Sequence, residues 1–316
     1  MSGPRVVALG GGHGLAASLG ALRLVTDQIT AVVTVADDGG SSGRLRAEFD
    51  VLPPGDLRMA LAALCDDREW GQIWRDVLQH RFGGTGPLAG HALGNLLIVA
   101  LWDQLGDTVA GLDLVGRLLD SRGRVLPMAG QPLQIEAEIL GDDPSEPQAV
   151  QVVRGQHKVA SSLGRVLNIR LVPEVPRSCP EALEAISQAE WVFLGPGSWF
   201  TSVLPHVLVP GLREALASTS AQRVLNLNLD VHRGETKGYR AVDHLTSLAH
   251  HAPELQIDVV LADPSAVDDA AEVRAVAAVL GAELVIAPVA AMSRPGHHDT
   301  LRLAAAYRDL LAERSA

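Results

Sequence analysis

The chain has 316 residues, of which 47% are hydrophobic and 20% charged, a composition typical of a soluble globular protein with room for one large α/β domain. Its formal net charge of −11 argues against a general nucleic-acid binder and against an anionic membrane surface as a partner. Two distant cysteines, Cys65 and Cys179, predict free thiols, and the lack of a signal sequence or of a membrane-length apolar run predicts a cytoplasmic protein without membrane insertion.

The first stretch is an apolar strand over residues 6–9, followed by a glycine-rich loop and a helix over residues 16–22. Four of the five residues from 10 to 14 are glycines, which leave backbone N–H groups accessible to another molecule. A helix start adds free N–H donors and the positive end of the peptide dipoles, so the loop suits a phosphate or diphosphate. The spacing matches neither the dinucleotide fingerprint nor a Walker A loop, and a turn without a ligand is the alternative. The predicted contacts are Gly11, Gly12, His13 and Gly14.

A β-branched run over residues 29–35 predicts a strand covered on both faces, as in a parallel sheet. The polar loop after it, residues 36–46, should face the glycine loop, because ligands of such sheets lie beyond the carboxyl ends of the strands. Paired acids here suit a ribose hydroxyl or Mg²⁺, and the small residues offer donors to phosphate; a solvated loop is the alternative. The predicted contacts are Asp37, Asp38, Gly39, Gly40, Ser41 and Ser42.

Polar residues also accompany the next predicted helices. Asp56 reads as the N-cap of a helix over residues 57–64, and for both Asp56 and Arg58 a capping role and a site role remain open. A further helix is predicted over residues 70–79. A third opens around residue 88 and continues to residue 105, placing His91 and Asn95 four residues apart on one apolar face. These two side chains are either satisfied within the core or contact the ligand.

Between about residues 125 and 175 the pattern changes to strict alternation of apolar and polar residues, which predicts half-exposed antiparallel strands. We expect this segment to be an insertion packed on the main sheet of a single domain, residues 1–316, and we find no chemistry in it. The segments with this pattern are residues 122–128, 133–139, 150–153 and 166–172.

The doubly wound pattern then resumes with a helix over residues 180–189 and a buried strand over residues 191–194. The loop that follows is rich in small and hydroxyl residues, which suit a phosphate or sugar, although a purely structural loop is the alternative. It lacks the spacing of a nucleophile elbow. The predicted contacts are Gly195, Pro196, Gly197, Ser198 and Thr201.

A strand over residues 224–229 carries two more predicted contacts, Asn226 and Asn228, on one face. The remaining strands and helices are predicted over residues 242–249, 257–262, 268–280, 284–287 and 300–314. His297, His298 and Asp299 precede the last helix, where Asp299 is a cap, but no second cluster completes a metal site. Together the elements predict an α/β fold with a Rossmann-like, doubly wound, mostly parallel sheet and an antiparallel β insertion.

Taken together, these motifs resemble the YvcK family of gluconeogenesis factors in the CofD-like superfamily. The resemblance covers residues 5–310, and His13, where many members carry Thr, resembles the actinobacterial branch. It implies a CofD-like fold and a cytoplasmic, UDP-sugar-binding regulator, with UDP-N-acetylglucosamine as ligand. Such proteins serve cell shape and cell wall biogenesis through peptidoglycan precursor supply during gluconeogenic growth. The motifs lie at residues 10–15, 33–46, 53–56, 90–95 and 195–202.

The superfamily also contains an enzyme branch, CofD, which is a Mg²⁺-dependent 2-phospho-L-lactate transferase. By that resemblance Asp37 and Asp38 would hold Mg²⁺, whereas the regulator needs no cofactor and has no catalytic residue. Many YvcK members have Arg-His-Asp before the last helix, and this chain has His297 in place of the arginine. The resemblance further implies a homo-oligomer, a dimer by analogy, and a regulatory protein partner is a third hypothesis.

Overall fold

The computed structural model describes residues 3–229, 234–236, 238–294 and 296–314. Within them a seven-stranded sheet forms the centre of the molecule, and all its strand pairs are parallel. Its strands are β1 (Val6–Gly10), β2 (Ile29–Val33), β3 (Arg124–Pro127), β7 (Trp191–Leu194), β8 (Gln222–Asn226), β9 (Val259–Ala262) and β10 (Glu283–Ile286).

The sheet is ordered β10-β9-β8-β7-β1-β2-β3, which is the strand order of a doubly wound Rossmann fold with one additional strand. From β1 the chain builds outward to β3, and it later returns to β7 on the other side of β1. Val6 therefore pairs with Ile29 on one side and with Trp191 on the other. The direction of winding reverses between β1 and β7, and this confirms the predicted fold class.

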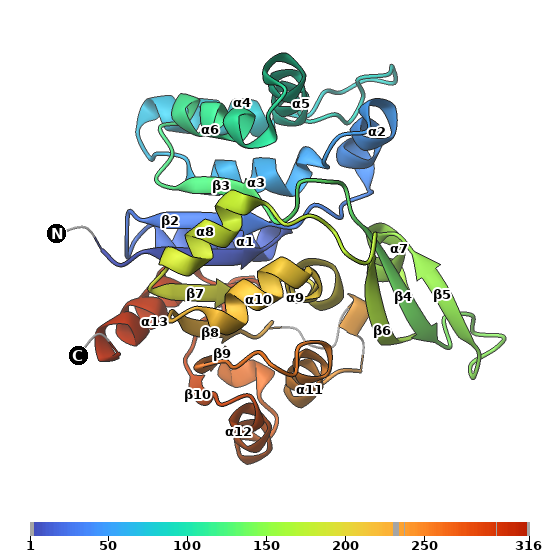
Figure 1. Ribbon diagram of the computed structural model, residues 1–316, viewed down its shortest axis with the longest axis vertical. Helices are drawn as coiled ribbons and strands as arrows, with labels where there is room; N and C mark the ends of the chain where they lie inside the picture. The colour runs from blue at the N-terminus through green and yellow to red at the C-terminus, as the bar shows by residue number, and fades with distance from the viewer. Residues whose placement is uncertain (1–2, 230–233, 237, 295, 315–316) are drawn as a thin grey trace.

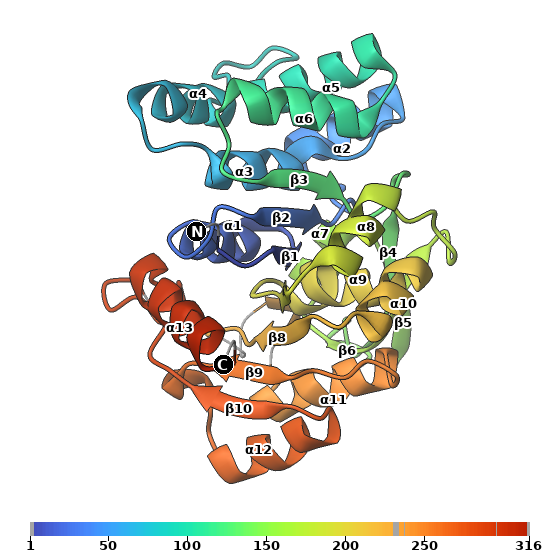
Figure 2. The ribbon, with the colours of Figure 1, turned by 60° about the vertical axis from the view of Figure 1, so that its left-hand side comes forward.

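Helices cover both faces of this sheet. In Figures 1 and 2, α8, α9 and α10 lie on one face, while α1, α3 and α13 lie on the other. The helices are α1 (Gly12–Leu22), α2 (Gly40–Phe49), α3 (Pro54–Leu64), α4 (Glu69–Gln79), α5 (Leu93–Leu105), α6 (Thr108–Leu118), α7 (Gln156–Ser161), α8 (Pro180–Gln188), α9 (Leu204–Leu208), α10 (Pro210–Ser218), α11 (Ala241–His251), α12 (Ala270–Val279) and α13 (Thr300–Glu313). Three short turns complete the described elements: η1 (Trp199–Val203), η2 (Gly234–Thr236) and η3 (Pro264–Ala266).

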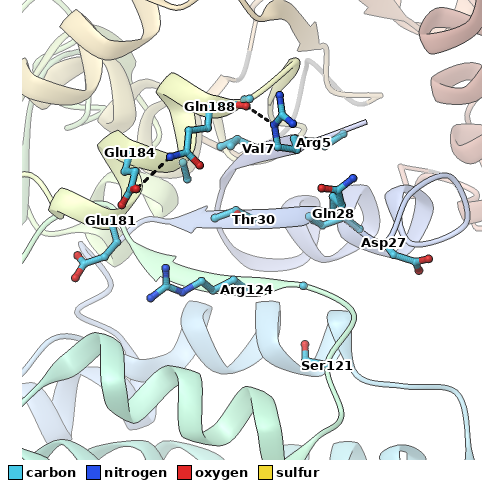
Figure 3. A pocket seen from close by; sticks show the side chains of 15 residues that line it. Arg5, Val7, Asp27, Gln28, Thr30, Ser121, Arg124, Glu181, Glu184 and Gln188 are labelled. Carbon is cyan, nitrogen blue, oxygen red and sulfur yellow. Dashed lines mark hydrogen bonds between the residues drawn. The ribbon is translucent and has the colours of Figure 1, made fainter. Parts of the chain in front are cut away.

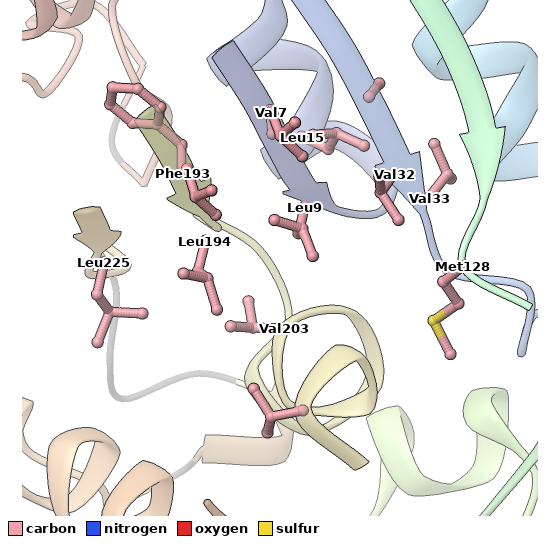
Figure 4. Close-up of a cluster of buried hydrophobic side chains, with 14 of the residues drawn as sticks. Val7, Leu9, Leu15, Val32, Val33, Met128, Phe193, Leu194, Val203 and Leu225 are labelled. Carbon is pink, nitrogen blue, oxygen red and sulfur yellow. The ribbon is translucent and has the colours of Figure 1, made fainter. Parts of the chain in front are cut away.

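The core lies where the central strands meet these helices. Every residue of β1 and β7 is buried, as expected for strands covered on both faces. Figure 4 shows Val7 and Leu9 of β1 with Val32, Phe193 and Leu225 from the neighbouring strands in one continuous cluster. The central strands are thus held firmly, and the loops at their carboxyl ends leave a rigid support.

The antiparallel insertion is a separate three-stranded sheet in the order β5-β4-β6. It comprises β4 (Gln134–Leu140), β5 (Val150–Arg154) and β6 (Arg165–Val172) and lies to the right of the main sheet in Figure 1. The expectation that it begins near residue 125 is wrong, because β3 pairs in parallel with β2. An edge strand of a parallel sheet and a half-exposed antiparallel strand share one local pattern, and only the distant partner distinguishes them.

Some helix starts also differ from expectation. α2 begins at Gly40, inside the predicted loop, because Arg44, Leu45 and Ala47 propagate a helix from the Gly-Ser-Ser start. α5 begins at Leu93 rather than near residue 88, and α6 was not predicted. The expected cap of α13 is confirmed, since Asp299 accepts from the first backbone N–H groups of that helix. No helix in the described part of the chain is long and apolar enough to cross a membrane.

Candidate functional site

Two glycine-containing loops touch where the winding of the sheet reverses. A Cβ atom added to Gly14 would lie 2.3 Å from the Pro196 carbonyl oxygen and 2.5 Å from the Gly197 Cα atom, so only glycine fits. Gly12, by contrast, has a φ of +56° and open space where a side chain would lie. The structure thus brings the predicted contacts of the first and third loops together at the position where open α/β sheets bind ligands.

The third loop is held by the strand beside it. The Asn228 side chain accepts a hydrogen bond from the Gly197 N–H at 2.9 Å and donates one to the Gly197 carbonyl at 2.7 Å. Asn226 donates to the Gly195 carbonyl at 3.2 Å. Both asparagines, predicted as ligand contacts, therefore support the loop, and the Asn228 amide bonds to Gly197 through both its oxygen and its nitrogen.

A cavity of about 260 Å³ lies between these two loops. This volume is below the usual size of a drug-sized ligand pocket and suits one ring of a larger ligand. Ala160 of α7 borders it, so the insertion contributes to its wall. The side chains and backbone around it include Gly14, Gly197, Ser198, Trp199, Asn228, Glu235 and His298.

The paired acids Asp37 and Asp38 have different roles. Asp37 accepts the Gly39 N–H at 2.9 Å within its own loop. Asp38 accepts the His157 N–H at 3.0 Å, at the start of α7, and so attaches the insertion to the second loop. A Cβ atom at Gly155 would come within 2.1 Å of the Asp38 carboxylate, which shows how closely the two segments pack.

This arrangement bears on the Mg²⁺ expectation. Among the residues described, no group of three or more His, Cys, Asp or Glu side chains is placed to hold a metal ion. Mg²⁺ in proteins is commonly held by one or two carboxylates together with substrate phosphates and water. Asp37 and Asp38 fit that pattern only if a bound phosphate supplies further ligands, so the magnesium assignment stays a prediction.

Asp56 is a buried carboxyl directly below the glycine loop. A Cβ atom at Gly11 would lie 2.6 Å from its Oδ2, which has no hydrogen-bond partner in the described part of the chain. Burial, together with the Asp37 charge, raises the pKa of Asp56 to about 7, against the opposing effects of the Gly12 N–H and the Arg58 charge. The predicted capping role is wrong, because α3 begins at Pro54 and Asp56 lies inside its first turn.

Four predicted residues form a buried hydrogen-bonded chain. Arg58 Nε donates to Asn95 Oδ1 at 2.9 Å, Asn95 Nδ2 donates to Ser41 Oγ at 3.0 Å, and Ser41 Oγ lies 3.0 Å from His91 Nδ1. None of the four is more than 6% exposed. The expected shared helix face is wrong, since His91 precedes α5, yet both residues reach Ser41.

The electrostatics of this chain follow from its burial. Burial lowers the pKa of Arg58 to about 10, with a further contribution from Arg81. It also lowers the pKa of His91, so the imidazole is neutral at physiological pH. Ser41 Oγ accepts from Asn95 and lies within hydrogen-bonding distance of His91, so the hydroxyl, which is only 5% exposed, is engaged inside the protein.

The remaining predicted residues differ in how far they are exposed at the surface of the loops. His13, Gly40 and Ser198 are exposed, whereas Ser42 and Thr201 are buried. His298 borders the cavity, and burial lowers its pKa to about 4.

Sequence reasoning missed Glu235. Its carboxylate is 6% exposed and accepts the Phe200 N–H at 2.8 Å. Burial raises the pKa of Glu235 to about 7. Its only sequence signal is an acidic residue in a short polar turn after β8.

A second, larger cavity of about 580 Å³ lies at the opposite edge of the sheet. Figure 3 shows it between the amino ends of β1 and β2 and the helix α8. Arg5 donates to the Gln188 carbonyl at 2.6 Å, and Gln188 donates to Glu184 at 3.1 Å, so these polar groups already pair with one another. None of the predicted contacts lines this cavity, and we place the candidate site at the carboxyl edge.

Comparison with known proteins supports the resemblance. The sequence model of a family described as "2-phospho-L-lactate transferase CofD" matches residues 6–294. A protein of Mycobacterium tuberculosis named "Putative gluconeogenesis factor" is 52% identical over 305 residues, covering 95% of this chain and 88% of that protein. The "Gluconeogenesis factor" of Bacillus subtilis is 37% identical over 266 residues, covering 84% and 80%. A crystal structure of a UPF0052-family protein from Bacillus halodurans superposes with a TM-score of 0.82 at 30% identity, covering 97% of this chain and 99% of that one.

Proposed function

The chain belongs to the CofD family, in which its relatives carry the name gluconeogenesis factor, and we propose from this that it is a nucleotide-sugar-binding regulator. The observation that carries the proposal is the contact between Gly14 and Pro196, which sets two phosphate-suited loops against each other at the switch point of the sheet. UDP-N-acetylglucosamine is the ligand we propose, as the resemblance implies.

In this proposal the diphosphate lies over Gly12. That residue begins α1, the space at its Cβ position is open, and the N–H groups that follow it at the helix start are donors for an anion, although the Gly12 N–H itself is directed at Asp56. A protein with a net charge of −11 has to hold an anion through such local donors. One ring of the ligand then enters the cavity of about 260 Å³.

A regulatory role is favoured over catalysis by the burial of the one predicted contact that pairs a serine with a histidine. Ser41 Oγ lies 3.0 Å from His91 Nδ1 and accepts from Asn95, but the residue is only 5% exposed, so a ligand in the loops has little access to it. The proposed regulator acts on cell shape and peptidoglycan precursor supply during gluconeogenic growth, in the cytoplasm, as a homo-oligomer and through a protein partner.

The alternative is a transferase of the CofD type, favoured by the description of the matching family and by the proximity of Asp37 to Asp56. Here Asp37 and Asp38 would hold Mg²⁺ on a nucleotide diphosphate ester, and the metal would supply charge stabilisation during phosphoryl transfer. Asp38→Asn would then abolish Mg²⁺-dependent turnover.

Calorimetric titration distinguishes the two. The regulator predicts saturable binding of UDP-N-acetylglucosamine with and without Mg²⁺, and no product by chromatography after prolonged incubation. Binding of GDP that requires Mg²⁺, with no binding of the UDP-sugar, would favour the transferase. If neither nucleotide binds, the assignment of the two loops is wrong.

A further inference from the structure

Glu235 is a buried acid beside the cavity, and the proposed function does not use it. It lies in η2, is 6% exposed, and borders the cavity between the first and third loops. Its Oε1 accepts the N–H of Phe200 at 2.8 Å, whereas its Oε2 is buried and has no hydrogen-bond partner among the residues that the structure describes. A buried carboxyl oxygen without a partner is costly, and such groups mark sites where a ligand completes the bonding.

The position of this carboxyl explains the shape of the third loop. Phe200 lies in the π-helical turn η1, directly after the Gly195–Ser198 segment, and Glu235 holds it from one side. Asn228 holds Gly197 from the other. The loop is therefore braced by two residues that follow β8 in the sequence, and its shape depends on both.

The charges around Glu235 also bear on which ligand groups can bind beside it. Burial is the main reason for its raised pKa, opposed by the backbone N–H groups of Phe200 and Thr201 and by the Thr201 hydroxyl. The elements packed against η2 are η1, α7 and β6. The ionisable groups on these elements and across the cavity are His157, Lys158, Arg165, Arg170 and His298.

None of these side chains contributes to the raised pKa of Glu235, so the ionised carboxylate would present a negative charge to the cavity. It would repel a phosphate and attract a hydrogen-bond donor.

We propose that Glu235 positions the third loop and that its second oxygen receives a hydrogen bond from a donor-bearing ring of the ligand, either a sugar hydroxyl or a base N–H. This inference rests on the proposed function and deepens it by specifying the orientation of the bound ligand. The donor-bearing ring lies in the cavity beside Glu235, and the diphosphate lies away from it, over Gly12.

The variant Glu235→Gln tests this. A glutamine has the same shape but only one oxygen, and the Phe200 N–H requires that oxygen, so the ligand would meet an amide NH₂ instead of an acceptor. At pH 8 we expect Glu235→Gln to bind UDP-N-acetylglucosamine about 10- to 100-fold more weakly than the unaltered protein does. We expect its affinity for inorganic pyrophosphate to stay within about twofold, because the phosphates lie elsewhere. Glu146→Gln, an exposed acid in the insertion, is the matched control and should change neither.

A UDP titration locates the donor. If the variant loses affinity for UDP as well, the donor belongs to the nucleoside, as a base N–H or a ribose hydroxyl; if it loses affinity only for the UDP-sugar, a hydroxyl of the N-acetylglucosamine ring contacts Glu235. Equal losses for pyrophosphate and for the UDP-sugar would show a purely structural role and overturn the inference. Equal affinities of the variant and the unaltered protein would overturn it too.

A pH series is the second measurement. It is made on the unaltered protein and so does not depend on whether a variant folds. If the ligand binds the ionised carboxyl, a free-state pKa of about 7 predicts affinity for UDP-N-acetylglucosamine about tenfold lower at pH 6 than at pH 8. Glu235→Gln should show a smaller change. Affinity that is independent of pH would overturn the inference while leaving the proposed function intact, whereas binding of pyrophosphate without any UDP-sugar would reject the proposed function itself.

Discussion

Gly14 and Pro196 pack so closely that the backbone of one loop occupies the space of a side chain on the other: a Cβ atom at residue 14 would lie 2.3 Å from the Pro196 carbonyl oxygen. These residues lie 182 positions apart in the sequence, yet they define one wall of the crevice. The contact sets the separation of the two loops, and so any change that separates them should alter ligand affinity.

Gly14→Ala should therefore separate the loops. We expect a loss of about 1–3 kcal/mol in the free energy of unfolding, as for other overpacked sites, together with weaker binding of UDP-N-acetylglucosamine. Chemical denaturation and calorimetry measure the two effects. Gly83→Ala is the control, because Gly83 has no neighbour within 4 Å. A Gly14→Ala protein with unchanged stability and affinity would contradict the packing.

Gly12 allows a different substitution. Its Cβ position is open, and its φ of +56° lies in the left-handed region, where an alanine costs about 1–2 kcal/mol. Gly12→Ala and Gly12→Val share this backbone cost, but only valine fills the space above the loop. We expect ligand affinity to be lost with valine and reduced only a few-fold with alanine. Equal affinities for the two variants, measured by calorimetry, would place the phosphate elsewhere.

Asp56 should make stability depend on pH. Because its folded-state pKa of about 7 is higher than its ordinary value of 3.8, the native protein binds this proton more tightly than the unfolded chain does. The burial of Asp56 therefore lowers the free energy of unfolding little at pH 4, where the buried carboxyl is protonated. The loss of stability grows as the pH rises to 7 and the carboxyl ionises. Asp56→Asn removes the charge, and we expect its stability relative to the unaltered protein to rise between pH 4 and pH 8 by up to about 4 kcal/mol.

Urea denaturation at pH 4 and pH 8 measures that difference. Asp103→Asn, a change at an exposed acid on α5, is the control and should leave the pH dependence unchanged. If the difference in unfolding free energy between Asp56→Asn and the unaltered protein is the same at pH 4 and pH 8, Asp56 is not the buried titrating group described above.

Asn95 is the central member of the buried polar chain. Asn95→Ala would remove the oxygen that accepts from Arg58 Nε. The Nη1 of the same guanidinium already lacks a partner among the described residues, so the variant would leave a buried charged group with two unsatisfied donors. We expect a loss of about 2–4 kcal/mol in unfolding free energy. Asn95→Asp keeps an acceptor for Arg58 and should lose less. A loss below about 0.5 kcal/mol for the alanine variant would indicate that water replaces the asparagine.

The sequence allowed the fold to be predicted where local pattern and tertiary role agree. The β-branched run of β2 indicates a strand covered on both faces, and the glycines after β1 indicate an exposed backbone turn. The prediction failed where a distant partner decides: Val125 and Leu126 read equally well as part of the insertion until β2 is seen beside them. The resemblance supplied the family, which no local pattern carries.

The candidate site shows the same limit. The sequence pattern singled out three polar residues as candidates, Ser41, Arg58 and Asn95. Their hydrogen-bonded chain joins three helices that are distant in the sequence, and no local pattern predicts it. Glu235 was missed because a glutamate in a polar turn normally faces water. Only its packing against Phe200 shows otherwise.

The placement of β1 has a consequence for synthesis on the ribosome. β1 can pair with β2 as soon as residue 33 has emerged, but its other partner begins at Trp191. At about 5–20 residues per second, the roughly 160 residues between them take on the order of 10–30 s to translate. For that interval the central strand of the finished sheet is an open edge, able to pair with any other chain. The glycine loop after β1 therefore meets the loop after β7 only once the second half of the sheet has been translated.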